Sequence, residues 1–189
     1  NVPTTYVPDN NFEQALIDLG YDDVLDDYVV TDSINSVTYL NVYNDSISDL
    51  TGIEAFTALD TLVCGFNQLT ELDVSNNTAL TQMSIGGNQL TSLDVSSNTA
   101  LTYLDCHLNQ ITSLDLSSNT ALTSLSCRHN DLTELDVSSC TALTLINGYG
   151  NQLTSLDVSN NTALTYLTCN NNQLTYLNMK NGVTDALTT

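Results

Sequence analysis

The chain has 189 residues, of which 22 are acidic and two are Lys or Arg, so its formal net charge at pH 7 is −20. This charge argues against binding to nucleic acid or anionic membranes, which need clusters of basic side chains. No apolar run reaches the roughly 18 residues of a membrane-spanning helix. Hydrophobic residues make up 41% of the chain, which is too many for an acidic disordered segment. One folded domain is therefore expected.

Residues 1–36 are predicted to form an N-terminal cap with one short helix. Asp9 or Asn10 can serve as the helix N-cap, and Gly20 can end the helix. The apolar face of this helix is formed by Phe12, Ala15, Leu16 and Leu19. We expect the cap to cover the apolar edge of the array that follows.

One pattern recurs through residues 37–179. Its seven copies begin at Val37, Leu59, Leu80, Leu101, Leu122, Leu143 and Leu164. The first spacing is 22 residues and the others are 21 residues. The copy at Leu101 reads LTYLDCHLNQITSLDLSSNTA, and its first eleven residues match LxxLxLxxNxL. A repeat of this length predicts a solenoid in which each coil packs only on its neighbours.

Alternation in the first half of each copy predicts a strand. In the fourth copy Leu104 and Cys106 point inward while Tyr103 and Asp105 point outward. Asn109 then turns the chain, and stacked copies place these amides in a ladder that satisfies buried backbone groups. The equivalent residues are Asn67, Asn88, Asn130, Asn151 and Asn172. The predicted fold has a parallel β-sheet on its concave face.

The second half of each copy repeats the alternation more briefly. Leu114 and Leu116 point inward and Asp115 points outward, which predicts short extended or irregular segments on the convex face. Residues 180–189 are predicted to be a C-terminal tail or partial cap.

These motifs resemble the leucine-rich-repeat family over nearly the whole chain. The first copy, VTYLNVYNDSISDLTGIEAFTA, is similar to internalin-type repeats. Later copies, with NQLTSLDVSNNTALTYLTC, resemble repeats of secreted and surface proteins of Bacteroidetes-type bacteria, and VPDNNFEQALIDLG looks like their N-terminal cap. The resemblance implies a leucine-rich-repeat solenoid that binds a ligand, usually a protein, through its concave sheet.

Four of the five cysteines share the inward third position of the strand motif. They are Cys64, Cys106, Cys127 and Cys169. This position suits small apolar side chains, so we interpret these residues as free thiols packed in the core. Cys140 replaces the Asn of the NTA turn in the fifth copy and is interpreted as a separate free thiol.

An acidic row on the convex face needs a stabilising partner. It consists of Asp73, Asp94, Asp115, Asp136 and Asp157. Neighbouring carboxylates about 5 Å apart repel by about 1 kcal/mol in water and by more at a lower dielectric. Water and hydroxyl groups of Ser and Thr are the favoured explanation, and Ca²⁺ at Asp94, Asp115 and Asp136 is the alternative. No other cofactor or metal is predicted.

The outward concave positions differ from copy to copy and contain both histidines and the one arginine. Adjacent strands lie about 4.8 Å apart, so His107, Arg128 and Tyr149 are expected to touch in sequence. The predicted binding site consists of Tyr103, Asp105, His107, Arg128, His129, Asn147, Tyr149 and Tyr166. Catalysis is not expected, because Asp105 and His107 should stand roughly 7 Å apart with no nucleophile fixed beside them.

The functional hypothesis is a non-enzymatic extracellular recognition scaffold that binds a protein partner. We expect a secreted or cell-surface location, with any signal peptide already removed, since the chain begins at Asn1. One alternative is a glycan-binding module of a cell-surface or polysaccharide-degrading system. Its stacking residues would be Tyr39, Tyr43, Phe66, Tyr103, Tyr149 and Tyr166. The other alternative is a structural spacer in a larger surface protein.

Overall fold

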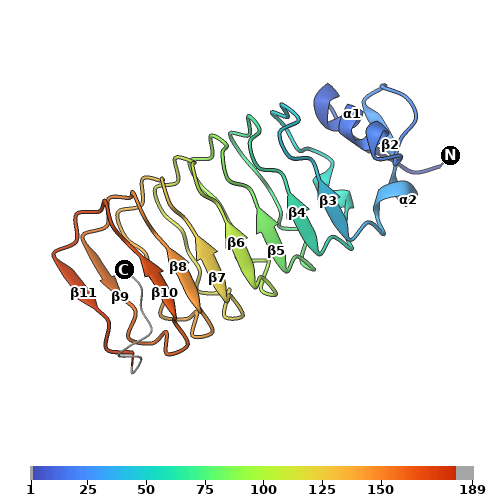
Figure 1. The fold of residues 1–189 in the computed structure, drawn as a ribbon. Coiled ribbons are helices and arrows are strands. Elements are labelled where there is room, and N and C mark those ends of the chain that lie inside the picture. The colour runs from blue at the N-terminus through green and yellow to red at the C-terminus, as the bar shows by residue number, and fades with distance from the viewer. Residues whose placement is uncertain (1, 182–189) are drawn as a thin grey trace.

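The computed structural model describes residues 2–181 as one stack of coils with the cap at its N-terminal end (Figure 1). Seven parallel strands form one sheet in the order β10-β8-β7-β6-β5-β4-β3. They are β3 (Tyr39–Asn41), β4 (Thr61–Val63), β5 (Gln82–Ser84), β6 (Tyr103–Asp105), β7 (Ser124–Ser126), β8 (Leu145–Asn147) and β10 (Tyr166–Thr168). The predicted solenoid with a parallel sheet is confirmed.

Each strand contributes its central residue to the core. Leu104 pairs in register with Leu125, and both side chains are fully buried. The flanking residues of each strand face outward, as the alternation predicts. Because the register shift between neighbours equals one repeat, equivalent residues line up as columns across the sheet.

The other face of the coils is less regular. A second parallel sheet consists of β9 (Ser155–Asp157) and β11 (Tyr176–Asn178), and the 3-10 helix η1 (Ile53–Ala55) lies in the first coil. In the coils between them the corresponding segments form no regular strand. The short extended or irregular convex segments that the sequence predicts are therefore present. Their inward side chains, such as Leu114 and Leu116, are buried.

The cap contains more structure than its predicted helix. It consists of β1 (Thr4–Tyr6), α1 (Asn10–Asp18), β2 (Tyr28–Val30) and α2 (Thr31–Ile34). Strands β1 and β2 pair antiparallel. No helix within residues 2–181 is long and apolar enough to cross a membrane.

The helix α1 buries Phe12, Ala15 and Leu16 as predicted, but the assignment of Leu19 to its apolar face is wrong. Leu19 is the C-cap residue and its side chain is 45% exposed. The helix ends at Asp18, the residue before Leu19, and Gly20 then turns the chain with a φ of 79°. Residues 182–189, most of the predicted C-terminal tail, lie outside the described residues.

Asp9 fixes the cap to the first coil. Its Oδ1 accepts hydrogen bonds from the backbone N–H groups of Asn11 at 2.9 Å and Phe12 at 3.1 Å, as an N-cap does. Its Oδ2 accepts from the N–H and hydroxyl of Ser48 and from the N–H of Asp49. Partial burial raises the pKa of Asp9, but the hydrogen bonds outweigh burial, so the net pKa is lowered.

Glu13 is a buried carboxylate that the sequence analysis did not identify. It lies in the first turn of α1 with no exposed surface. Its Oε1 accepts hydrogen bonds from the backbone N–H groups of Asp26 at 2.8 Å and Tyr28 at 3.1 Å. Glu13 thereby holds the acidic loop and the start of β2 against the helix.

The predicted asparagine ladder is confirmed in detail. The side chain of Asn109 donates to the carbonyl of Cys106 in its own coil at 3.1 Å and to that of Ile85 in the preceding coil at 3.2 Å. Its oxygen accepts from the N–H of Leu90 at 3.0 Å. One amide thus satisfies three backbone groups and ties two coils together.

A second asparagine ladder, not identified from the sequence, runs along the NTA turns. Its members are Asn77, Asn98, Asn119 and Asn161. Each amide nitrogen donates to two backbone carbonyls of the preceding coil. Each amide oxygen is buried and has no hydrogen-bond partner among the described residues. Cys140 takes the equivalent place in the fifth coil, where its thiol donates to the backbone carbonyls of Leu116 at 3.6 Å and Asn119 at 3.5 Å. A thiol supplies the donor and adds no unpaired amide oxygen, which explains why the position accepts Cys.

We expect Asn109→Ala to lower the free energy of unfolding by about 2–4 kcal/mol, because it leaves several buried backbone groups unpaired. Urea unfolding followed by far-UV circular dichroism measures this loss. The control is Asn76→Ala at an exposed position, which we expect to change stability by less than about 0.5 kcal/mol. Equal effects of the two substitutions would contradict the role of the ladder.

We expect Asp9→Asn to destabilise the chain by about 1–2 kcal/mol at pH 7, because an amide N–H₂ would face the donors of Ser48. The lowered pKa means that the carboxylate stabilises the fold above its unfolded value of 3.8 and loses this effect as the pH falls below it. The stability difference between wild type and variant should therefore shrink between pH 5 and about pH 3. Urea titrations across this range test the prediction, with Asp23→Asn as an exposed control. A constant difference would refute it.

Candidate functional site

The predicted site residues lie on the concave sheet and just beyond the C-terminal ends of its strands. Tyr103 and Tyr166 occupy the first outward position of β6 and β10, and both are more than one third exposed. Asp105 and Asn147 end β6 and β8 at the second outward position. The remaining site residues follow the strands; they are His107, Arg128, His129 and Tyr149.

The structure brings Asp105 and His107 together, contrary to the sequence-based expectation. Nδ1 of His107 lies 2.8 Å from Oδ1 of Asp105, and the backbone N–H of His107 donates to the same oxygen at 3.2 Å. The expected 7 Å separation assumed a continuing strand. Strand β6 ends at Asp105, so the chain bends there and the imidazole folds back.

Within residues 2–181, no nucleophilic side chain is hydrogen-bonded to the Asp105–His107 pair. No hydroxyl or thiol of the described residues forms a hydrogen bond with the imidazole of His107. Ser84 and Ser126, which flank Asp105 in register on the neighbouring strands, form no side-chain hydrogen bond with it. The pair therefore lacks the nucleophile–base contact of a hydrolytic site.

His129 and Tyr149 form a second pair. Their rings meet edge to face with centroids 5.0 Å apart and an interplanar angle of 77°. The Tyr149 hydroxyl accepts a hydrogen bond from the side chain of Asn171 at 2.6 Å. This ring contact joins residues of two neighbouring columns. The expectation from the sequence was contact between members of one column.

Arg128 is half-buried at the same edge of the sheet. Within residues 2–181 its side chain forms no ion pair and no hydrogen bond, although the chain has 22 acidic residues. Its guanidinium group therefore has no partner among the described residues. No hydrogen bond, ion pair or ring contact of the described residues joins it to His107 or Tyr149, and the expected packing of the three side chains in sequence stays a prediction.

One column at this edge has a left-handed backbone in every coil. Its residues are Asn44, Phe66, Gly87, Leu108, His129, Gly150 and Asn171, with φ between 52° and 72°. Glycine and asparagine accept this conformation, whereas it costs bulky side chains on the order of 1–3 kcal/mol. Phe66 and Leu108 adopt it while their side chains are 43% and 42% exposed, so burial in the core does not offset the strain.

Phe66 and Leu108 are not among the residues predicted for the main site. Phe66 was predicted only as a stacking residue of the glycan-binding alternative. The composition of the column could have indicated the unusual backbone of these two residues. Recurrent Gly and Asn at one repeat position indicate a positive φ.

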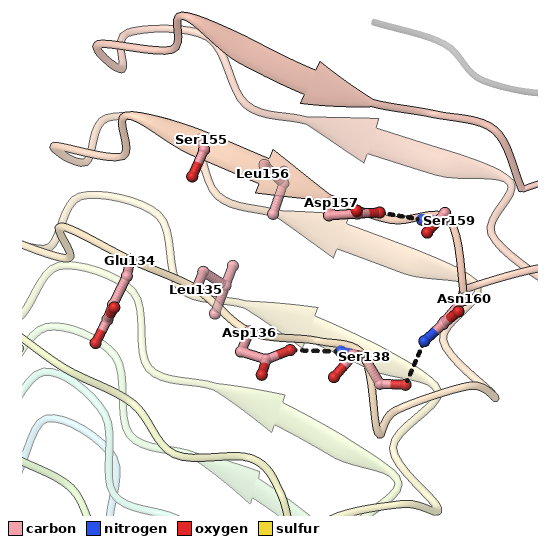
Figure 2. A pocket seen from close by; sticks show the side chains of 9 residues that line it. All are labelled: Glu134, Leu135, Asp136, Ser138, Ser155, Leu156, Asp157, Ser159 and Asn160. Carbon is pink, nitrogen blue, oxygen red and sulfur yellow. Dashed lines mark hydrogen bonds between the residues drawn. The ribbon is translucent and has the colours of Figure 1, made fainter.

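The convex face carries an open pocket of about 420 Å³ between the fifth and sixth coils (Figure 2). Leu135 and Leu156 line it together with the carboxylates of Asp136 and Asp157. Each carboxylate accepts a hydrogen bond from the backbone of the serine two residues later, at 2.9 Å and 2.8 Å. The pocket thus lies away from the predicted site.

The same aspartate–serine pair recurs along the whole acidic row. The pairs are Asp73–Ser75, Asp94–Ser96, Asp115–Ser117, Asp136–Ser138 and Asp157–Ser159. These hydrogen bonds lower the pKa of every member of the row and outweigh the repulsion between neighbours. No group of three or more metal-ligating side chains forms within residues 2–181, and Ca²⁺ at Asp94, Asp115 and Asp136 stays a prediction.

The cysteines lie where the alternation places them. Cys64, Cys106 and Cys127 are fully buried and Cys169 is half-buried, all as free thiols. Burial raises the pKa of Cys64 and Cys127 to about 12, so these thiols are not activated nucleophiles.

No protein-family model matches the chain. It is 41% identical over 73 residues to internalin J of Listeria monocytogenes serotype 4b, a match that covers 39% of this chain and 8% of that protein. The functional domain of InlJ from Listeria monocytogenes, which includes a cysteine ladder, superposes with a TM-score of 0.55 and 32% identity, over 93% of this chain and 52% of that one.

The crystal structure of internalin C2 from Listeria monocytogenes matches 96% of this chain and 92% of its own length, with a TM-score of 0.65 and 21% identity. At this identity the likeness shows the fold alone. The chain spans a small part of internalin J and about half of its solved domain. Repeats and these similarities together show a leucine-rich-repeat solenoid that is similar to the bacterial internalins.

Proposed function

We propose that the chain is a non-enzymatic recognition module that binds a protein partner through the concave sheet and its C-terminal edge. The observation that carries this proposal is Arg128. It is the one arginine of a chain with 22 acidic residues, and its side chain has no ion pair or hydrogen bond within residues 2–181. Arginine is among the residues that contribute most to protein interfaces, because its planar group forms several hydrogen bonds at once.

The surroundings of Arg128 support the same proposal. His129 and Tyr149 are held against each other beside it, and Tyr103 and Tyr166 are exposed on the sheet. Rigid aromatic side chains gain contact area with little loss of conformational entropy. A secreted or cell-surface location belongs to the proposal and is supported by the resemblance of the repeats to those of secreted and surface bacterial proteins.

Glycan binding is the second candidate, because exposed tyrosines can stack on sugar rings. The tilt of the rings argues against it. Among its stacking residues, Tyr43 and Phe66 have rings in contact, and these rings meet at 54°, so the two form no coplanar platform for a polysaccharide chain. A structural spacer, the third hypothesis, would bind no ligand. This role does not explain why the side chain of Arg128 lacks a partner within residues 2–181.

Binding of the labelled chain to arrays of purified extracellular proteins and of glycans tests the proposal. We expect a protein ligand whose affinity falls at least about tenfold, or ~1.4 kcal/mol, in the Arg128→Ala/Tyr149→Ala double variant. The matched control is Ser92→Ala/Ser113→Ala, two exposed positions on the opposite face. Protein binding that survives the concave variant, or binding to glycans alone, would overturn the proposal.

A further inference from the structure

Three rings form a row beside the first four coils, along the edge where the concave strands end. The Tyr43 and Phe66 rings lie 5.4 Å apart, and the Phe66 and His107 rings lie 5.9 Å apart. With Leu108, the next residue after His107, we call these side chains the ring row. Phe66 belongs to the second coil and His107 to the fourth, so the row passes over the third coil.

Glycines make this arrangement possible. A Cβ atom on Gly87 would lie 3.0 Å from the Phe66 ring, and a Cβ atom on Gly86 would overlap the His107 ring. In the second coil Gly65 lies beneath the Tyr43 ring, where a Cβ atom would come within 3.5 Å of it. The gap that the rings bridge therefore exists because side chains are missing at these positions.

The backbone conformation of two residues of the ring row is energetically unfavourable in the chain alone. Phe66 and Leu108 take the left-handed conformation with φ of 55° and 52°, and their side chains are 43% and 42% exposed. Asn44 and Gly87 show which residues suit the same backbone in neighbouring coils. Neither the local conformation nor the core explains the bulky residues, which indicates contact with a molecule outside the chain.

Charge identifies the chemistry of that molecule. The net charge of −20 attracts cationic partners and repels anionic ones over a long range. Asp45, which is exposed, lies two residues from Tyr43, whereas the carboxylate of Asp105 is already paired with His107. Lysine and arginine side chains bind to the faces of aromatic rings, and their apolar stems pack on groups such as Leu108.

We propose that the ring row binds a segment of the partner protein that is rich in Lys and Arg. This inference rests on the proposed function, because it names the chemistry of one part of the protein ligand. The tilted rings leave separate faces between which individual side chains fit, at 54° and 61° to each other. The free guanidinium of Arg128 lies one coil beyond the row and contacts a different part of the partner.

Fluorescein-labelled decalysine, titrated into the chain at physiological salt, tests the proposal by anisotropy. We expect Phe66→Gly/Leu108→Gly to weaken binding at least about tenfold, because the cation–π and stem contacts are lost while every charge is kept. The matched control, Asp94→Asn/Asp115→Asn, removes two charges from the convex face and should weaken binding by less than about threefold, because charges beyond a Debye length are screened.

The opposite order of effects would show diffuse charge attraction and overturn the inference, as would equal losses. Binding to neutral cello-oligosaccharides in place of decalysine would assign the row to glycans and also overturn it. Thermal melting checks the fold of the glycine variant, and Phe66→Asn/Leu108→Asn provides a second variant with a residue that this backbone already accepts.

The two proposals fail in different ways. A protein ligand that is lost with Arg128→Ala/Tyr149→Ala but kept with Phe66→Gly/Leu108→Gly would leave the proposed function standing and refute the ring row. The absence of any protein ligand, together with decalysine binding that ignores the ring-row variant, would refute both.

Discussion

The stack depends on one buried amide per coil. Asn109 and its equivalents bond to backbone groups of their own coil and of the preceding coil, where no backbone partner is available. A coil that slipped along the axis would leave these groups unpaired, so the ladder sets the register of the strands. Because the register is fixed, equivalent residues line up as columns. These columns make up the surface of the concave face.

The sequence predicted the solenoid, the sheet and the inward cysteines, because these follow from the spacing of Leu and Asn within a single coil. The ladder of Asn109 and its equivalents links neighbouring coils and was also predictable, because its Asn recurs at one repeat position, whereas features that depend on a local bend, a side-chain rotamer or a missing side chain were not. The Asp105–His107 bond requires the bend after β6, and the Phe66–His107 contact requires the space above Gly86 and Gly87. The burial of Glu13 depends on how a loop folds back on its helix.

The two faces of the solenoid handle charge in different ways. On the convex face each aspartate of the acidic row is stabilised within its own coil, as in the Asp115–Ser117 pair, so the row is compatible with a high negative charge. On the concave edge the cation of Arg128 has no internal partner among the described residues. The aspartates of the row thus have hydrogen-bond partners within the chain, whereas Arg128 has none among the described residues.

Cys140 makes the second ladder uneven along the solenoid. On both sides of the fifth coil the ladder has amide hydrogen bonds of 2.8–3.0 Å, while Cys140 forms thiol hydrogen bonds of 3.5–3.6 Å. A thiol is a weaker donor than an amide, so the link between the fourth and fifth coils is weaker at this turn than the equivalent links on either side. The fifth coil, which carries Arg128, is therefore joined to its predecessor less firmly than the other coils of this ladder are.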